Sequence, residues 1–225
     1  MRQFTPIGML LSLVLLVLFP IIFGQVMVAA LIKLHLTQAT AIYLVFGIIF
    51  GGLVNIPVKR IVRSEAMPSN PLAVFGMSST VSQLTRMRRE TIIAVNLGGC
   101  VIPAALAVYE FGQLLTAAAP ALPALAIVCA VNTFACYAIA RPVQGLGIVM
   151  PGFVSPLTAA ILAMVLAPSA APPVAFIAGV VGPLVGADLL HLKDITKNAV
   201  GVASSGGAGT FDGIVLSGIV AAYLA

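Results

Sequence analysis

Long apolar stretches, separated by short polar turns, make up most of this sequence. Several of them approach or exceed the roughly 20 residues that an α-helix needs to cross the hydrocarbon core of a bilayer. The ten-residue alternation typical of transmembrane barrel strands does not occur. The pattern therefore predicts an all-α, polytopic transmembrane helix bundle of about seven spans. The expected spans cover residues 6–36, 37–55, 91–112, 117–140, a short fifth helix that ends near residue 167, 173–190, and the last part of the chain after residue 209.

Polar residues, prolines and glycines mark the ends of these spans. Thr37 is a suitable N-cap for the second span. Arg141-Pro142 closes the fourth span, because proline disfavours helical geometry in the residue before it. Glycine and proline break two further segments, 144–156 before span five and 201–209 before span seven. Non-helical backbone at membrane depth is tolerated only against protein or a wet cavity, so these breaks are candidate site segments.

We expect residues 1–225 to form a single integral membrane domain. Residues 58–90 are the one long polar excursion within it, and we place them in the cytoplasm. The first apolar run follows a single charge, Arg2, and is far longer than the core of a signal peptide. That length predicts a retained signal anchor.

Composition supports a membrane protein and removes several function classes. The chain is 61% hydrophobic and 8% charged, whereas soluble domains carry about 25% charged residues. Its net charge of +5 would suggest nucleic-acid binding in a soluble domain, but the basic residues flank apolar spans, where they meet anionic lipid. We therefore expect a lipid bilayer as partner and no nucleic acid. The three cysteines lack the CxxC spacing of a metal or redox site, and no cofactor is predicted.

The distribution of basic residues predicts the orientation of the spans. With the N-terminus in the cytoplasm, ten of the eleven lysines and arginines face inside and only Lys33 faces outside. Glu110 then lies at the outer end of the third span. Asp188 falls at the inner end of span six, and Asp212 falls near the inner start of span seven. Because these helices are adjacent and antiparallel, the two carboxyls are expected at one depth.

These aspartates are the main candidates for chemistry. An unneutralised carboxylate within a bilayer costs roughly 2.5 to 3.5 kcal/mol on insertion scales, so such residues often mark a pathway or a reacting site. Two carboxyls a few Å apart in a poorly hydrated site share one proton, and the pair can then activate water against an amide carbonyl. Asp188 and Asp212 are thus a candidate catalytic dyad. Flexible or polar neighbours are candidates for substrate binding: Gly186, Gly207, Gly209, Thr210, Gly213 and Asn96.

Simpler interpretations of the same residues remain open. Asp212 is also suited to cap the last helix, and Asp188 to lie at headgroup level beside Lys193 or Lys197. Asp188, His191 and Asp194 recur at three-residue helical steps and form a weak alternative as metal ligands.

Transport is a second functional alternative. Broken helices are typical of the midplane site of secondary transporters, where a carboxylate couples ion to solute. The intramembrane asparagines Asn55, Asn96 and Asn132 fit this alternative, although interhelical hydrogen bonding accounts for them more simply.

Several motifs resemble the landmarks of an uncharacterised prokaryotic family of multi-pass membrane proteins, known as domain of unknown function 1614. They are Val54-Asn55-Ile56-Pro57-Val58, Asn96-Leu97-Gly98-Gly99 with Ile102-Pro103, Arg141-Pro142-Val143, Gly186-Ala187-Asp188-Leu189-Leu190, and Gly206-Gly207-Ala208-Gly209-Thr210-Phe211-Asp212-Gly213. The resemblance runs from about residue 45 to the end of the chain. It implies a small polytopic protein of a bacterial or archaeal cell membrane and brings no established activity.

A looser similarity exists to the intramembrane aspartyl proteases. Those enzymes use one aspartate in a Gly-x-Gly-Asp motif and a second on another helix, whereas this chain has Gly-Ala-Asp188 and Gly-Thr-Phe-Asp212. Our leading hypothesis is an intramembrane aspartyl-type peptidase that acts on a membrane peptide near the cytoplasmic boundary. The alternatives are a small-solute or ion-coupled transporter that uses the same carboxylates, and a non-catalytic membrane scaffold. The oligomeric state is not predicted.

Overall fold

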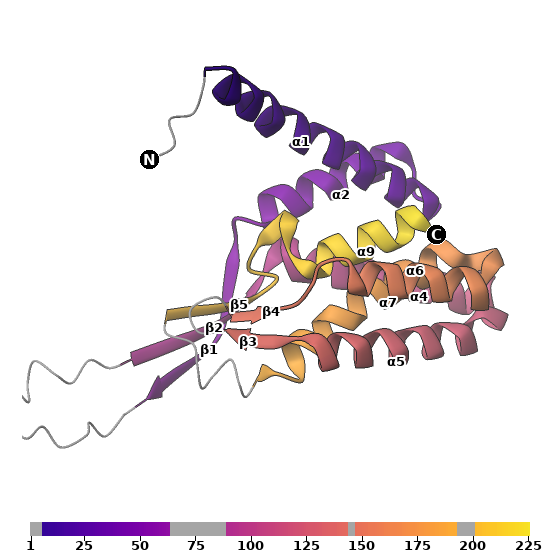
Figure 1. Ribbon diagram of the computed structural model, residues 1–225. Coiled ribbons are helices and arrows are strands. Elements are labelled where there is room, and N and C mark those ends of the chain that lie inside the picture. The colour runs from indigo at the N-terminus through magenta and orange to yellow at the C-terminus, as the bar shows by residue number, and fades with distance from the viewer. Residues whose placement is uncertain (1–5, 64–88, 144–146, 193–200) are drawn as a thin grey trace, which may run out of the picture.

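The fold is mostly helical. The structure is a computed structural model that describes residues 6–63, 89–143, 147–192 and 201–225 (Figure 1). Seven α-helices occur in these residues: α1 (Pro6–Lys33), α2 (Gln38–Gly51), α4 (Ile102–Ala117), α5 (Leu122–Ile139), α6 (Val154–Leu166), α7 (Ala171–Val181) and α9 (Gly213–Leu224). Two π-helical segments extend this set, since η2 (Leu97–Val101) leads into α4 and η5 (Gly182–Leu189) continues α7. Short 3-10 turns precede α5, α7 and α9: η3 (Ala119–Ala121), η4 (Pro168–Ala170) and η6 (Gly209–Phe211).

Three of the described helical stretches are long and apolar enough to cross a membrane. They are Leu97–Ala117, Ala119–Ile139 and Pro168–Leu189. The part of α1 from Pro20 to Lys33 and the helices α2, α6 and α9 are shorter apolar stretches; α9, for example, has 12 residues, which at a rise of about 1.5 Å per residue is about 18 Å. A helical membrane protein is therefore well supported, while the number of seven spans stays a prediction.

The chain is not helical throughout, which differs from the all-α expectation, because the described residues include five strands at one end of the helices. β1 (Asn55–Arg63) pairs antiparallel with β2 (Arg89–Asn96), and β2 pairs parallel with β5 (Gly201–Ser205). A second, two-stranded sheet joins β3 (Arg141–Val143) to β4 (Gly147–Val149). The predicted excursion thus begins and ends as paired strands, and its residues 64–88 lie outside the described residues.

The third helix begins later than predicted. Residues 91–96 belong to β2, and the helix starts at Leu97. Thr91, Ile92, Ile93 and Val95 are β-branched, and such side chains favour strands. Asn96 then acts as the N-cap of η2, because its side chain accepts a hydrogen bond from the backbone N–H of Gly99.

The C-terminal end of this helix also differs from the prediction. The helix continues to Ala117, past the predicted end near Gly112, and Glu110 lies on its buried side.

Other boundaries agree with the sequence pattern. Thr37 caps α2 by accepting a hydrogen bond from the backbone N–H of Thr40. α5 ends at Ile139, directly before Arg141-Pro142. These ends are set by local chemistry and are visible in the sequence.

α7 occupies the centre of the bundle. Nine of its eleven residues are buried, and it packs against α4, α5, α6 and α9. Helix direction alternates along the chain from α2 to α9, so the helix ends gather at two opposite faces of the bundle (Figure 1). We call the face that carries the strands the strand face.

A buried polar cluster joins the central helices. Asn132 of α5 donates through Nδ2 to Ser155 Oγ (2.9 Å) and to the carbonyl of Ala178 (2.8 Å). Ser155 is in turn hydrogen-bonded to Ser217 of α9. Asn132 therefore makes the interhelical hydrogen bonds expected of an asparagine within a membrane bundle.

Candidate functional site

Asp212 lies at the strand face, where it is the N-cap of α9. Its carboxylate accepts hydrogen bonds from the backbone N–H groups of Ile214 (3.0 Å) and Ala208 (3.4 Å). Burial raises the pKa of Asp212 above its ordinary value, and these two hydrogen bonds oppose the increase. The positive end of the helix dipole also favours the ionised form. The capping role considered from the sequence is therefore real, and it leaves the carboxylate oriented by backbone donors.

Asp188 comes to the same face from the end of η5. The side chain of Ser205 lies near its carboxylate, which interacts electrostatically with Asp212 and with His191. Cys100 interacts electrostatically with both carboxyls. The structure thus brings Asp188 and Asp212 together, and it adds Ser205 and Cys100, which sequence reasoning missed.

Close backbone contacts bring these residues into one place. Gly206 and Gly209 both have positive φ, 73° and 60°, which a side chain would strain. Gly206 lies against Gly99, next to Cys100, and Gly209 lies against Gly52 at the end of α2. The turn between β5 and α9 therefore packs closely against η2 and the end of α2. This packing positions Asp212 near η5.

The predicted substrate-binding residues divide into two groups. Gly207 is exposed, and Thr210 and Gly213 are half-buried, so all three are accessible within the segment around Asp212. Gly186 instead packs against α5, where a Cβ atom would overlap the carbonyl of Thr133.

Asn96 and Gly209 are likewise committed to packing. Asn96 is fully buried and bonded to Gly52, Asn55 and Gly99, and Gly209 lies against Gly52. The contacts of these two residues, like those of Gly186, are packing contacts within the fold, and their predicted role in substrate binding stays a prediction.

Comparison with known proteins gives a family but no activity. The family described as "Protein of unknown function (DUF1614)" matches residues 49–224. The chain belongs to this family. No curated protein and no solved structure matches the chain. Within the DUF1614 match lie both aspartates, the turn before α9, and the strand face from β1 onward.

The metal-site alternative has little support in the described part of the DUF1614 chain. His191 uses Nδ1 to contact the carbonyls of Gly186 and Ala187, each at 3.1 Å, and its ring packs on Tyr137 with centroids 4.9 Å apart. Asp194, the third expected ligand, lies outside the described residues. Among those that are described, no group of three or more His, Cys, Asp or Glu side chains could hold a metal ion.

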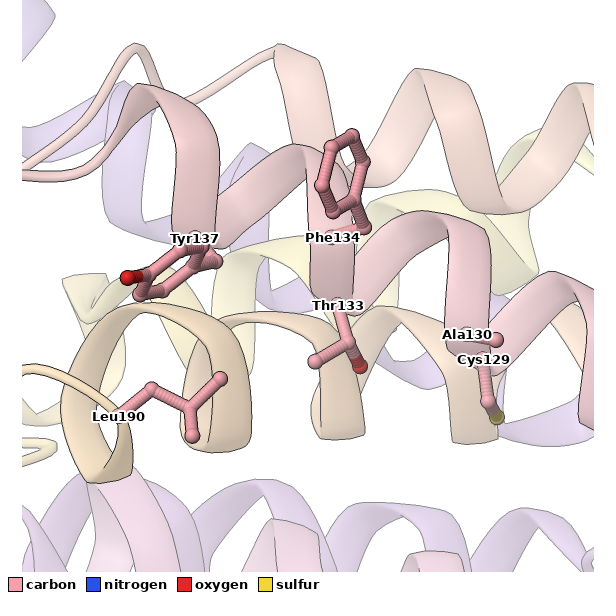
Figure 2. A pocket seen from close by; sticks show the side chains of 6 residues that line it. All are labelled: Cys129, Ala130, Thr133, Phe134, Tyr137 and Leu190. Atoms are coloured by element: carbon pink, nitrogen blue, oxygen red, sulfur yellow. The ribbon is translucent and has the colours of Figure 1, made fainter.

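An apolar groove of about 430 Å³ runs along α5 of the DUF1614 bundle. Figure 2 shows that its side chains come from successive turns of α5, with Leu190 added from the chain that follows η5. The lining residues are Cys129, Ala130, Thr133, Phe134, Tyr137 and Leu190. None of them is charged, so the groove offers no chemistry comparable to the carboxyl pair.

Proposed function

We propose that this chain is a membrane-embedded aspartyl peptidase in which Asp188 and Asp212 form the catalytic pair. The supporting observation is the electrostatic interaction between these two carboxyls at the strand face. Like charges close together in a poorly hydrated site are unfavourable, so the pair carries one proton. Aspartyl hydrolysis needs no metal or organic cofactor.

The two carboxyls have different surroundings, and these support a different role for each in the reaction. Asp212 has two backbone N–H donors and the helix N-terminus, so it is the carboxylate that removes a proton from water. Asp188 carries the shared proton and gives it to the oxygen of the scissile carbonyl. The resulting tetrahedral diol collapses as one of its hydroxyls returns a proton to Asp188 and the leaving nitrogen takes a proton from Asp212, so that water and one amide yield one acid and one amine and the pair again holds one proton.

The strand face lies on the cytoplasmic side in this proposal. Lys59, Arg60 and Arg141 belong to its strands, whereas Lys33 ends α1 at the opposite face. An excess of basic residues on one side is typical of cytoplasmic loops. Substrates are membrane peptides whose cleavage site can reach that boundary beside Gly207, Thr210 and Gly213.

The proposal is tested with protein reconstituted into liposomes together with quenched fluorogenic single-span peptides. Asp188→Asn and Asp212→Asn should each lower cleavage at least 100-fold, because a single remaining carboxyl cannot both activate water and protonate the carbonyl. Glu110→Gln removes a carboxyl from a different helix and is expected to leave cleavage unchanged. Residual cleavage above one tenth of wild type in either Asp variant would contradict the catalytic pair.

Ion-coupled transport is the alternative that the same site permits. The N-terminus of α9 and the π-helical segments beside both aspartates are features that membrane carriers use for ion sites. In that case the Asp variants abolish pH-driven solute uptake into liposomes and no peptide is cleaved. A scaffold, by contrast, would show only a change in thermal stability with the same variants.

A further inference from the structure

Glu110 occupies an unusual position for a carboxyl. The buried residues of α4 form one stripe at helical spacing, and Glu110 is a member of it: Pro103, Leu106, Ala107, Glu110 and Leu114. Its side chain is 2% exposed. The helix that carries it is one of the three able to cross a membrane. Glu110 therefore points into the bundle and away from the surrounding lipid.

Within the described residues, the Glu110 carboxyl has no counterion. Its Oε1 atom has no hydrogen-bond partner. α4 packs against α2, α7, α9, η2 and η3, and these elements contain no lysine, arginine or histidine. Their titratable side chains are Cys100, about 15 Å away along the same helix, and the tyrosines Tyr43 and Tyr223, which are exposed.

The basic residue at the C-terminal end of α1 is engaged in other contacts. Lys33, at the end of α1, donates a hydrogen bond from Nζ to the carbonyl of Tyr223 at 2.7 Å. It also lies over the ring of Tyr223, 5.7 Å from the centroid. It is therefore held at the C-terminus of α9 and does not neutralise Glu110.

An isolated carboxylate in such surroundings is costly, and buried acids without a partner take up a proton instead. We propose that Glu110 is a proton-binding site inside the membrane domain, occupied at neutral pH while this side of α4 stays buried. The bound proton can leave only when water or a cation reaches the buried side of α4. Glu110 thus gives the chain a second ionisable site, on a different helix and nearer the opposite face from Asp188 and Asp212.

The three glutamates of the chain, Glu65, Glu90 and Glu110, allow a direct test. In the Glu65→Gln, Glu90→Gln variant, Glu110 is the only glutamate, and growth with ¹³C-glutamate labels its carboxyl alone. Infrared spectra of the liposome-reconstituted variant at pH 7 then report its protonation. An exposed glutamate is protonated to about one part in 500 at that pH. For Glu110 we expect a protonated fraction of at least one half, which is more than 100-fold higher than that of an exposed glutamate.

The outcomes separate this site from the proposed peptidase. Glu110→Gln should remove the protonated carboxyl band from otherwise wild-type protein, and its amide is close in shape to the protonated acid, so the fold is retained. The band should persist in the Asp188→Asn, Asp212→Asn double variant, whether or not cleavage depends on those residues. A labelled band at the position of an ionised carboxylate at pH 7 would overturn the proposal.

Discussion

At the scale of single residues, Asn96 links three segments of the strand face. Its Nδ2 donates to the carbonyl of Gly52 (2.8 Å) and to Asn55 Oδ1 (3.1 Å), and its Oδ1 accepts from the backbone N–H of Gly99 (2.7 Å). Ser204 of β5 donates to the same Asn55 oxygen at 2.7 Å. Asn96 is fully buried, so water cannot replace these partners. The residue joins the end of α2, the start of η2 and the three-stranded sheet formed by β1, β2 and β5.

We expect Asn96→Ala to lower the free energy of unfolding by about 2 kcal/mol or more. The change leaves the Gly99 N–H and the Gly52 carbonyl unpaired in a buried place, and each such group costs about 1 to 3 kcal/mol. Asn55→Ala is the matched control, because Asn55 is exposed and water can take its place, with an expected loss below about 1 kcal/mol. Denaturant unfolding in detergent measures both; equal losses would show that Asn96 is not the central link.

At the scale of elements, backbone contacts between glycines decide how closely the helices approach. A Cβ atom on Gly98 would overlap the carbonyl of Ile48 and the backbone nitrogen of Gly52, and one on Gly99 would overlap the carbonyl of Gly206. Small residues at such crossings are typical of packed membrane helices. The same contacts hold the turn before Asp212 against η2.

Gly98→Ala should therefore separate α2 from η2, lowering the apparent Tm in detergent by several degrees and reducing any activity that needs Asp212. Gly112→Ala is the control on the same continuous helix, because nothing lies within 4 Å of its added Cβ atom. That change should be neutral or stabilise by about 0.5 to 1 kcal/mol, since alanine favours a helix more than glycine does. A Gly98→Ala protein as stable as Gly112→Ala would disprove the tight contact.

The elements also show what could be predicted from the sequence. Helices whose ends depend on one cap or one proline, such as α2 and α5, were located within a few residues. The sequence pattern predicted a helix where β2 occurs. A short continuous apolar run is compatible both with a buried strand and with part of a membrane span, so its periodicity does not distinguish them. The positions of Ser205 and Cys100 beside Asp188 depend on contacts between β5, η2 and η5, which no local pattern encodes.

At the scale of the whole molecule, two faces of opposite character emerge. The strand face holds β1 to β5, Lys59, Arg60, Arg141 and the carboxyl pair. The opposite face holds the end of α1, the η4 turn and the C-terminus of α9. A hydrogen bond from Lys33 to the carbonyl of Tyr223 joins α1 to α9. Charge thus gathers at one end of an apolar bundle, which is the condition for a fixed orientation in a membrane.

The orientation can be measured with two single-cysteine proteins in a background that lacks Cys100, Cys129 and Cys136. Val58→Cys places a thiol on β1 of the strand face, where Val58 is 66% exposed, and Ser169→Cys places one in the exposed η4 turn of the opposite face. Because basic residues favour the cytoplasm, a membrane-impermeant maleimide applied to intact cells should label the Ser169→Cys protein and spare the Val58→Cys protein. Inverted vesicles should give the reverse.

The opposite pattern would place the Asp188–Asp212 pair on the outer side, and equal labelling of both positions from one side would show that these faces are not separated by a membrane.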